Sequence, residues 1–259
     1  MDLNAIRNRL QSLQNKKGGA SKEDRSKTFW KPAVGKQVIR IVPSRFNKQN
    51  PFREVMFHYG VGNKTMLALT NFNEKDPIVE FAAQLKKTSD KENWTLAKKI
   101  SPKMRIFAPV IVRSEEDKGV RLWEFGREMY LELLGIAEDE DIGDYTDVMD
   151  GRDMTIDTVG PDVTGTKYNK SSVRIKPKTS ALSDDNEQIK AWISEQPDVL
   201  THYKKYEFEE MKTILMEWLE PSAETEEAAE ADPTPAVVEA IVPKKKGFDE
   251  EEFDSLFND

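Results

Sequence analysis

Apolar and β-branched residues gather in short runs along much of the chain, and polar turns separate the runs. Each run has the length of a strand rather than that of a helix. Pro43 closes the first run, and Glu115-Glu-Asp-Lys-Gly119 separates two later ones. Several short strands with limited helix favour a mostly β protein with some α, built around a small barrel, over a sheet of βαβ units. The predicted strands span residues 36–43, 52–59, 105–112, 120–125, 154–159 and 172–176.

The first twenty residues carry one apolar stripe at helical spacing, and basic residues flank it. The stripe is Leu3, Ile6, Leu10 and Leu13, and the basic residues are Arg7, Arg9, Lys16 and Lys17. Gly18-Gly19 then interrupts the pattern. Residues 1–20 are therefore predicted to form a basic arm on a flexible joint. The alternative is an ordinary first helix that packs on its own core.

Two later segments are also predicted to be helical. The first follows Gly126, and the second runs from Lys204 to Leu219. Both carry apolar residues on one face, a pattern typical of core packing. These faces consist of Met129, Tyr130, Leu133 and Leu134, and of Phe208, Met211, Leu215 and Trp218. Between the second and third strands, residues 63–91 show little periodicity and are predicted to form a small subdomain or a long excursion.

The net charge of −8 hides an asymmetry along the chain. Residues 220–259 contain 13 acidic residues against three lysines, a net charge of −10, so residues 1–219 carry +2. Within that part, residues 1–31 hold eight basic and three acidic side chains. The chain thus combines a weakly basic body with an acidic end. Its total charge does not argue against a nucleic-acid partner.

Cysteine is absent, and the only histidines are His58 and His202. Disulfides, thiolate catalysis and cysteine-containing zinc sites are therefore excluded, and little supports histidine metal sites or Ser-His-Asp catalysis. No apolar run approaches the roughly 18 residues of a membrane helix. The N-terminus lacks the apolar segment of a secretory signal. We expect a cytoplasmic protein with no membrane partner.

Two clusters combine cations with aromatic residues. Cations follow phosphates and release counterions, while aromatic faces stack on unpaired bases, so this mixture favours single-stranded nucleic acid. A helix or ribbon suited to a duplex groove is not evident. The alternative for each residue is a solvated cation or a core aromatic. The clusters are Trp94, Lys98, Lys99, Lys103, Arg105, Phe107 and Arg113, and Lys167, Tyr168, Lys170, Arg174, Lys176 and Lys178.

The acidic C-terminal end interleaves carboxylates with large apolar residues. Glu250-Glu-Glu252 lies among Phe248, Phe253, Leu256 and Phe257, and the last three follow i, i+3, i+4 spacing. This spacing is typical of a short amphipathic helix that docks in a groove. A tail that only solubilises the protein is the alternative. We expect residues 248–259 to recruit partner proteins and to compete with nucleic-acid phosphates for the basic body.

Two other functions stay open. A metal-dependent nuclease is the enzymatic one, because Glu138-Asp-Glu-Asp141, Asp144 and Asp147 cluster carboxylates that could bind Mg²⁺. They follow a predicted helix in a polar segment, where a solvated loop is the simpler interpretation. No nucleophile, general base or phosphate-binding glycine loop accompanies them, so we do not expect an enzyme. The other is a protein–protein adaptor with no nucleic-acid role, which rests on the tail alone.

Several short motifs, in order along the chain, resemble the single-stranded DNA-binding protein of T-even-type bacteriophages. Gln37-Val-Ile-Arg40 with Val42-Pro-Ser44 is similar to the first barrel strand of that family. Pieces of the central barrel, a later DNA-facing loop and the acidic tail also have counterparts. These are Trp94-Thr-Leu-Ala-Lys-Lys99, Val110-Ile-Val112, Glu124-Phe-Gly126, Gly165-Thr-Lys-Tyr168 and Phe248-Asp-Glu-Glu-Glu-Phe-Asp-Ser-Leu-Phe257.

The resemblance implies an OB-fold core, a five-stranded Greek-key barrel with a small inserted subdomain and flanking helices. It implies a protein that coats and protects single-stranded DNA during phage replication, recombination and repair. It also gives the basic arm a role in cooperative contact between neighbouring copies on the DNA. The residues it places at the DNA are Trp94, Lys98, Lys99, Trp123 and Tyr168, with Arg105 and Phe107 at less closely matched positions. Arg40 is also expected to contact DNA, on the basis of its charge alone. Lys170 and Arg174 are expected to contact DNA because they belong to the second cluster.

One departure from the family concerns zinc. The family's best-known member holds a structural zinc with one histidine and three cysteines, in the excursion after the second strand. His58 matches the histidine, but Asp76-Pro-Ile-Val79 stands where paired cysteines would be. A lone histidine does not complete a four-ligand site. We expect no zinc and no other cofactor, a hydrogen-bonding role for His58, and closure of residues 60–91 by packing among Leu67, Leu69, Phe72, Ile78 and Phe81.

Together these inferences divide the chain into four parts. Residues 1–20 form the arm, and residues 21–220 form the DNA-binding core, which includes the excursion 60–91. Residues 221–247 are a flexible linker because their Glu, Ala, Thr and Pro composition buries little apolar surface. Residues 248–259 form the partner-binding tail.

Overall fold

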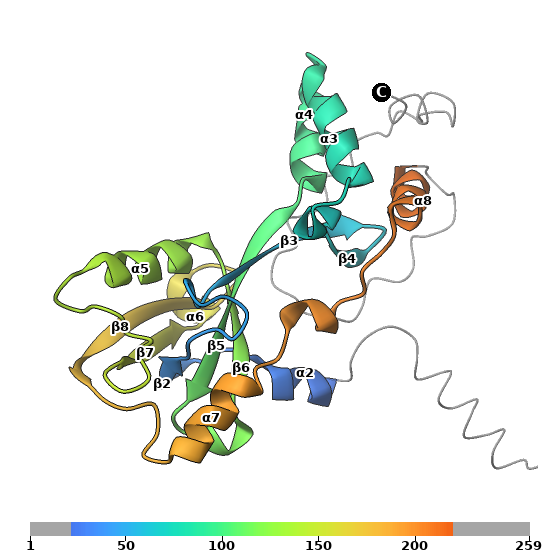
Figure 1. Ribbon diagram of the computed structural model, residues 1–259. Coiled ribbons are helices and arrows are strands. Elements are labelled where there is room, and N and C mark those ends of the chain that lie inside the picture. The colour runs from blue at the N-terminus through green and yellow to red at the C-terminus, as the bar shows by residue number, and fades with distance from the viewer. Residues whose placement is uncertain (1–21, 220–259) are drawn as a thin grey trace, which may run out of the picture.

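A computed structural model describes residues 22–219 of the chain (Figure 1). Within this range lie an eight-stranded sheet and seven α-helices. The strands are β1 (Phe29–Trp30), β2 (Gly35–Ile41), β3 (Arg53–Val61), β4 (Lys64–Leu67), β5 (Lys103–Val112), β6 (Arg121–Phe125), β7 (Arg152–Val159) and β8 (Lys170–Thr179). The α-helices are α2 (Lys22–Thr28), α3 (Pro77–Lys87), α4 (Lys91–Ile100), α5 (Arg127–Glu138), α6 (Pro161–Thr164), α7 (Asn186–Ser194) and α8 (Phe208–Leu219). Three short 3-10 helices span Leu69–Phe72, Glu116–Lys118 and Val199–His202.

The predictions for both ends of the chain lie outside the described residues. They concern the arm with Arg7, Arg9, Lys16 and Lys17, the linker, and the tail with Phe248, Phe253, Leu256 and Phe257. Between residues 22 and 219, none of the helices is long and apolar enough to cross a bilayer.

The strands pair in the order β1-β6-β5-β2-β7-β8, and β3 joins this sheet through β5. The long strand β5 connects two parts of the molecule. Its residues 110–112 pair with β2, and its residues 103–107 pair with β3. The buried side chains of β2, β5, β6 and β7 meet beneath α5, where Ile39, Val110, Trp123 and Ile156 share one core. This core has the alternating pattern of strands with one face inward.

A second apolar core lies at the far end of β3 and β5, where α3, α4 and α8 pack together (Figure 1). It includes Leu69, Phe81 and Ile100, and Leu215 of α8 joins them from the other end of the described chain. Helix α3 begins where the Asp76 carboxylate accepts hydrogen bonds from the amides of Ile78 and Val79, with proline at the first helical position. This subdomain therefore extends well beyond residues 60–91.

The segment after β8 returns across the sheet to the subdomain. Trp192 of α7 packs with Val42 and Ile111, and Val199 packs with Phe107. The chain then enters α8 and completes the second core. One continuous stretch of chain thus covers the outer side of β5 and ties the two cores together.

The prediction of a mostly β protein with some α is confirmed, and each predicted strand corresponds to one in the structure. The helical content was underestimated, since α3, α4 and α7 were not predicted. The segment Trp94–Lys99 belongs to α4 of the subdomain, so its assignment to the central barrel was wrong. The last helix begins at Phe208 rather than at Lys204. Of the five residues expected to close the excursion, Leu69, Ile78 and Phe81 do so, while Leu67 and Phe72 pack in the neighbouring cluster with Phe107.

Candidate nucleic-acid interface

The outer face of β8 carries two cations. Lys170 and Arg174 are exposed, with Ser172 between them on the same face, while Val173 and Ile175 turn inward and pack against the first core. Within residues 22–219, neither Lys170 nor Arg174 makes an ion pair with a carboxylate. Among the described strands, β8 pairs with β7 alone. The strand therefore presents two cations four residues apart on its outer face, and a phosphate backbone can lie along them.

The loop between β7 and β8 places an aromatic ring beside these cations. Helix α6 ends at Gly165, whose φ of +64° is readily adopted by glycine. The chain then turns, and the hydroxyl of Thr166 donates a hydrogen bond to the Tyr168 carbonyl oxygen at 2.8 Å. The Tyr168 side chain is 42% exposed. A ring presented in this way is available for stacking on an unpaired base.

Helix α4 carries a second exposed aromatic with its own cations. Trp94 is 52% exposed, and the Lys98 ammonium lies 5.5 Å from the centre of its ring. Trp94 and Lys98 are neighbours because they are four residues apart on a helix. Lys99 points to another ring, with its Nζ 5.7 Å from the centre of Trp218. The predicted group Trp94, Lys98 and Lys99 is therefore brought together on the subdomain surface.

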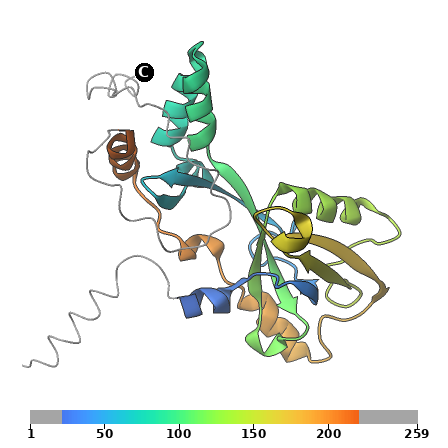
Figure 2. The same ribbon diagram turned by 180° about the vertical axis from the view of Figure 1, so that it is seen from behind.

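The β8 group and the α4 group lie on different parts of the molecule. In two views from opposite sides, α4 stands at the end of the β3–β5 connection, and β8 lies at the other end of the sheet beside α5 (Figures 1 and 2). The structure therefore keeps the α4 group and the β8 group apart, and it places Phe107 and Arg113 of the first predicted cluster away from Trp94. A bound strand that touches both groups would have to span the space between the subdomain and the β8 edge of the sheet.

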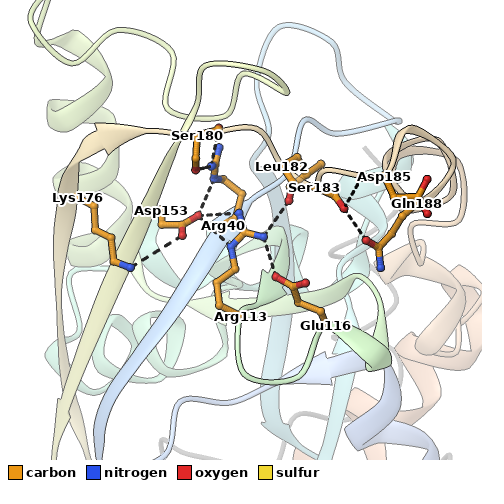
Figure 3. Close-up of polar contacts among 10 residues, drawn as sticks. All are labelled: Arg40, Arg113, Glu116, Asp153, Lys176, Ser180, Leu182, Ser183, Asp185 and Gln188. Atoms are coloured by element: carbon orange, nitrogen blue, oxygen red, sulfur yellow. Dashed lines mark hydrogen bonds and ion pairs between the residues drawn. The ribbon is translucent and has the colours of Figure 1, made fainter.

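Arg40 occupies a buried position, which does not fit the prediction that it contacts DNA. Its guanidinium donates hydrogen bonds to Asp153 Oδ1 at 2.9 Å, to the Ser180 carbonyl at 2.9 Å and to Ser180 Oγ at 2.6 Å (Figure 3). The side chain has no exposed surface. Gly151 allows the close packing here, because a Cβ at that position would lie 2.5 Å from the Arg40 guanidinium and 2.2 Å from a backbone oxygen. Arg40 is thus a structural residue of the sheet.

Asp153 is the centre of the same network. Its Oδ1 also accepts hydrogen bonds from Arg113 Nε at 3.1 Å and Nη2 at 2.9 Å, and Lys176 lies 4.0 Å from Oδ2 (Figure 3). Burial opposes ionisation of this carboxyl group. The two arginines outweigh that effect, and they hold the pKa of Asp153 below its ordinary value. Arg113 is therefore also engaged in holding β2, β5 and β7 together.

Phe107 and Trp123 lie in the core, which does not fit the prediction that they stack on bases. They are 1% and 2% exposed. Trp123 packs edge-on against Trp30, with ring centres 5.8 Å apart, and Phe107 packs in the same way against Phe29. Their neighbour Arg105 is partly exposed and lies 3.4 Å from a Glu124 oxygen. A phosphate bound by Arg105 would therefore lie close to the Glu124 carboxylate, which repels it.

His58 and Asp76 form a fully buried pair beneath the subdomain. His58 Nε2 lies 3.0 Å from Asp76 Oδ2, and Nδ1 lies 2.9 Å from the Ile100 carbonyl oxygen. The Ile100 carbonyl oxygen and the Asp76 carboxylate are both acceptors, and each faces one ring nitrogen of His58. Burial opposes ionisation of Asp76, but His58 and the amides of Val79 and Leu69 hold its pKa below the ordinary value.

The residues present do not fit a structural zinc site. Every polar atom of the His58 and Asp76 side chains already has a hydrogen-bond partner. No set of three or more potential ligands gathers within residues 22–219, and the sequence has no cysteine. The pair joins β3 to the start of α3 and to the end of α4.

The acidic segment after α5 forms a solvated turn. Asp144 Oδ1 accepts a hydrogen bond from the Thr146 amide at 2.8 Å, and Asp147 Oδ1 accepts bonds from the amides of Met149 and Asp150 at 2.7 and 2.8 Å. These carboxylates stabilise the backbone of the turn. They give no support to the nuclease hypothesis.

Sequence reasoning missed an exposed aromatic in the loop after β2. Phe46 lies there between two arginines, Arg45 and Arg53. The signal available in the sequence was the adjacent pair Arg45-Phe46, too short a motif to distinguish from chance. The position of Arg53 beside the ring follows only from the fold.

The comparisons with known proteins agree with this description. A comparison of the sequence with curated proteins gives no match. A family model described as gp32 DNA binding protein like matches residues 33–218, which is well over half of the chain and nearly all of its described part. The chain therefore belongs to the gp32 DNA binding protein like family.

Proposed function

We propose that the protein binds single-stranded DNA and coats it during phage replication, recombination and repair, in the cytoplasm of the host cell. The observation that carries this proposal is the outer face of β8, where Lys170 and Arg174 lie unpaired by described carboxylates next to the exposed ring of Tyr168. Cations for phosphates and open rings for bases suit a strand whose bases are unpaired. The family match supports the same partner.

The strand order supports an OB-type barrel as the scaffold. In β6-β5-β2-β7-β8, the first long strand β2 lies between β5 and β7, as the first strand of an OB barrel lies between the second and fourth. Barrels of this kind bind oligonucleotides with the face of strands two and three and with the loops after strands one and four. Those loops correspond here to the one that holds Phe46 and the one that holds Tyr168.

The test of this function is a titration of the intact protein with a labelled single strand and with a duplex of the same sequence, in the presence of Mg²⁺. We expect a stable shift of the single strand, weaker binding of the duplex and no cleavage. Cleavage of the single strand would favour the nuclease instead. No response to either DNA would favour the adaptor.

We further propose that the two ends of the chain regulate binding. The basic arm, residues 1–20, contacts the neighbouring copy on the DNA and makes binding cooperative. The tail, residues 248–259, recruits replication and recombination proteins through Phe248, Phe253, Leu256 and Phe257. The charge distribution supports this division, because the acidic end is attracted to the same cations as DNA.

Deletion of residues 221–259 is expected to tighten the binding of single-stranded DNA, because it removes twelve carboxylates against three lysines. The same deletion is expected to abolish recruitment of partner proteins. The gain in affinity is largest at low salt, since screening weakens the competition. Binding by fluorescence anisotropy at two salt concentrations, with pull-down of replication proteins, checks both parts. Unchanged affinity and unchanged recruitment together would rule out the role of the tail.

We also propose that the subdomain folds without zinc and that the protein needs no cofactor. The buried His58–Asp76 pair supports this, because it links the segments that a metal would otherwise connect. The cost of burying two charges is offset when each has several hydrogen-bond partners.

A further inference from the structure

The loop after β2 presents Phe46 on a rigid base. Three side chains cap the loop from within: Ser44 Oγ accepts from the Phe46 amide at 3.2 Å, Asn47 Oδ1 from the Gln49 amide at 3.0 Å, and Asn50 Oδ1 from the Phe52 amide at 2.8 Å. Turns closed in this way have few alternative conformations. The Phe46 ring nevertheless remains 42% exposed. A large apolar ring held open to solvent is suited to contact with a ligand.

Two guanidinium groups lie beside this ring. The Arg45 guanidinium carbon is 4.8 Å from the ring centre, and that of Arg53 is 5.5 Å away. Both arginines are held from behind. Arg53 forms an ion pair with Asp198 at 2.7 Å, and Arg45 donates a hydrogen bond to the Ser194 carbonyl. Each guanidinium has five N–H donors, so donors remain for a phosphate.

The loop itself is anchored to the segment that returns from the barrel. Gln196 is almost fully buried, its Oε1 accepts from the Arg45 amide at 2.9 Å, and its Nε2 donates to the Pro43 carbonyl at 2.7 Å. These two bonds bracket the start of the loop. Phe46 and both arginines are thereby fixed relative to β5 and β6, whose Phe107 and Leu122 line the apolar pocket next to Phe46.

A hollow of about 490 Å³ opens on the side of Phe46 that faces β3. Asn47, Asn50 and Glu54 line it together with the ring. Asn50 Nδ2 donates to Tyr130 Oη at 3.4 Å, and Tyr130 Oη donates to Glu54 at 3.0 Å, which keeps these side chains in place. Small-molecule sites commonly have about 300–1,000 Å³ with a few placed polar groups. The hollow therefore has room for one nucleotide.

We propose that Phe46 and this hollow bind one unpaired nucleobase of the DNA strand. The base stacks on the Phe46 ring, the guanidinium groups of Arg45 and Arg53 hold the adjoining phosphate, and the amides of Asn47 and Asn50 hydrogen-bond to the edge of the base. This inference rests on the proposed function and names a further contact for it. A paired base cannot enter, because its edge and faces are already occupied in a duplex.

The test replaces Phe46 by alanine in the full-length protein. Loss of one stacking partner is expected to lower the affinity for an oligothymidylate about tenfold. The affinity for an abasic oligonucleotide of equal length is expected to stay unchanged, because it keeps the phosphates and lacks the bases. Phe46→Trp is expected to restore the affinity and to add a fluorescence signal that DNA quenches, measured as the difference from wild type.

Leu131→Ala is the matched control, because Leu131 is also a large exposed apolar residue, 55% accessible, on the outer side of α5. Its affinity for both oligonucleotides is expected to equal that of the wild type. If the wild type binds oligothymidylate and Phe46→Ala binds it equally well, the base site is wrong and the proposed function stands. Equal losses on both oligonucleotides also overturn the base site. If the wild type binds no single strand, the proposed function fails first.

Discussion

Reversing the two exposed cations of β8, in the double variant Lys170→Glu/Arg174→Glu, is expected to weaken binding of single-stranded DNA more than tenfold. A tenfold loss corresponds to about 1.4 kcal/mol. Each phosphate that a cation neutralises releases a counterion and adds about 0.7 to the slope of log affinity against log salt for a single strand. Loss of both contacts is therefore expected to reduce the slope by about 1.4. Fluorescence anisotropy at several salt concentrations measures both quantities.

The control for this variant keeps the change in charge and moves its position. Lys118→Glu/Lys190→Glu also changes the net charge by −4, but both lysines are exposed partners of nearby glutamates, Glu115 and Glu187, away from β8. We expect a much smaller loss of affinity for this variant. Equal losses in the two double variants would show that total charge, and not the face of β8, governs binding. Thermal unfolding of both variants is expected to stay close to wild type, as for most surface substitutions.

Replacing Asp76 by alanine is expected to lower the free energy of unfolding by about 3–5 kcal/mol, the cost of removing one partner of a buried pair. The reason is that His58 would remain fully buried beside an empty position, and the amides of Leu69, Ile78 and Val79 would lose their acceptor. Asp90→Ala is the matched control. Asp90 caps α4 from an exposed position, so its loss is expected to cost about 1 kcal/mol.

The contribution of Asp76 also depends on pH. Its pKa in the folded protein lies below that in the unfolded chain, so its stabilising effect is present above about pH 4 and is lost as the pH falls through the folded value. The difference in unfolding free energy between wild type and Asp76→Asn is therefore expected to become smaller as the pH falls below about 4. A chelator is expected to leave the wild-type unfolding midpoint unchanged. A marked fall of the midpoint with chelator, or stoichiometric zinc by elemental analysis, would contradict the metal-free subdomain.

The strands were predictable because alternation and turn residues act locally. The runs that became β2, β5 and β6 carry the pattern in their own side chains, and Gly126 marks the start of α5. Helices α3 and α4 of the subdomain were not predicted, because part of their apolar face is covered by Met211 and Leu215 of α8, more than a hundred residues away. Asp76-Pro77 was a start signal for α3. In the sequence, Asp76-Pro77 was interpreted only as the place where the paired cysteines of the related zinc site are missing.

The residues of the candidate site were predictable where the exposure of a side chain follows from the alternation of polar and apolar residues along its own strand. Lys170 and Arg174 alternate with Val173 and Ile175, so the outward face of β8 can be read directly. Arg40 has the same alternation and yet lies inside, because Asp153 and Ser180 come from distant segments and surround it. Trp123 and Phe107 were ambiguous for a related reason. An aromatic residue on a strand stacks on bases or fills a core depending on what covers its face, and here Phe29 and Trp30 of β1 do so.

The most direct test of the central claim is the salt dependence of binding to a single strand and to a duplex of the same sequence, measured with the intact protein. The proposed function predicts preference for the single strand at every salt concentration, and affinity that falls steeply and linearly on a logarithmic scale as salt rises. Equal affinity for the two DNAs, or affinity for the single strand that does not change with salt, would contradict it.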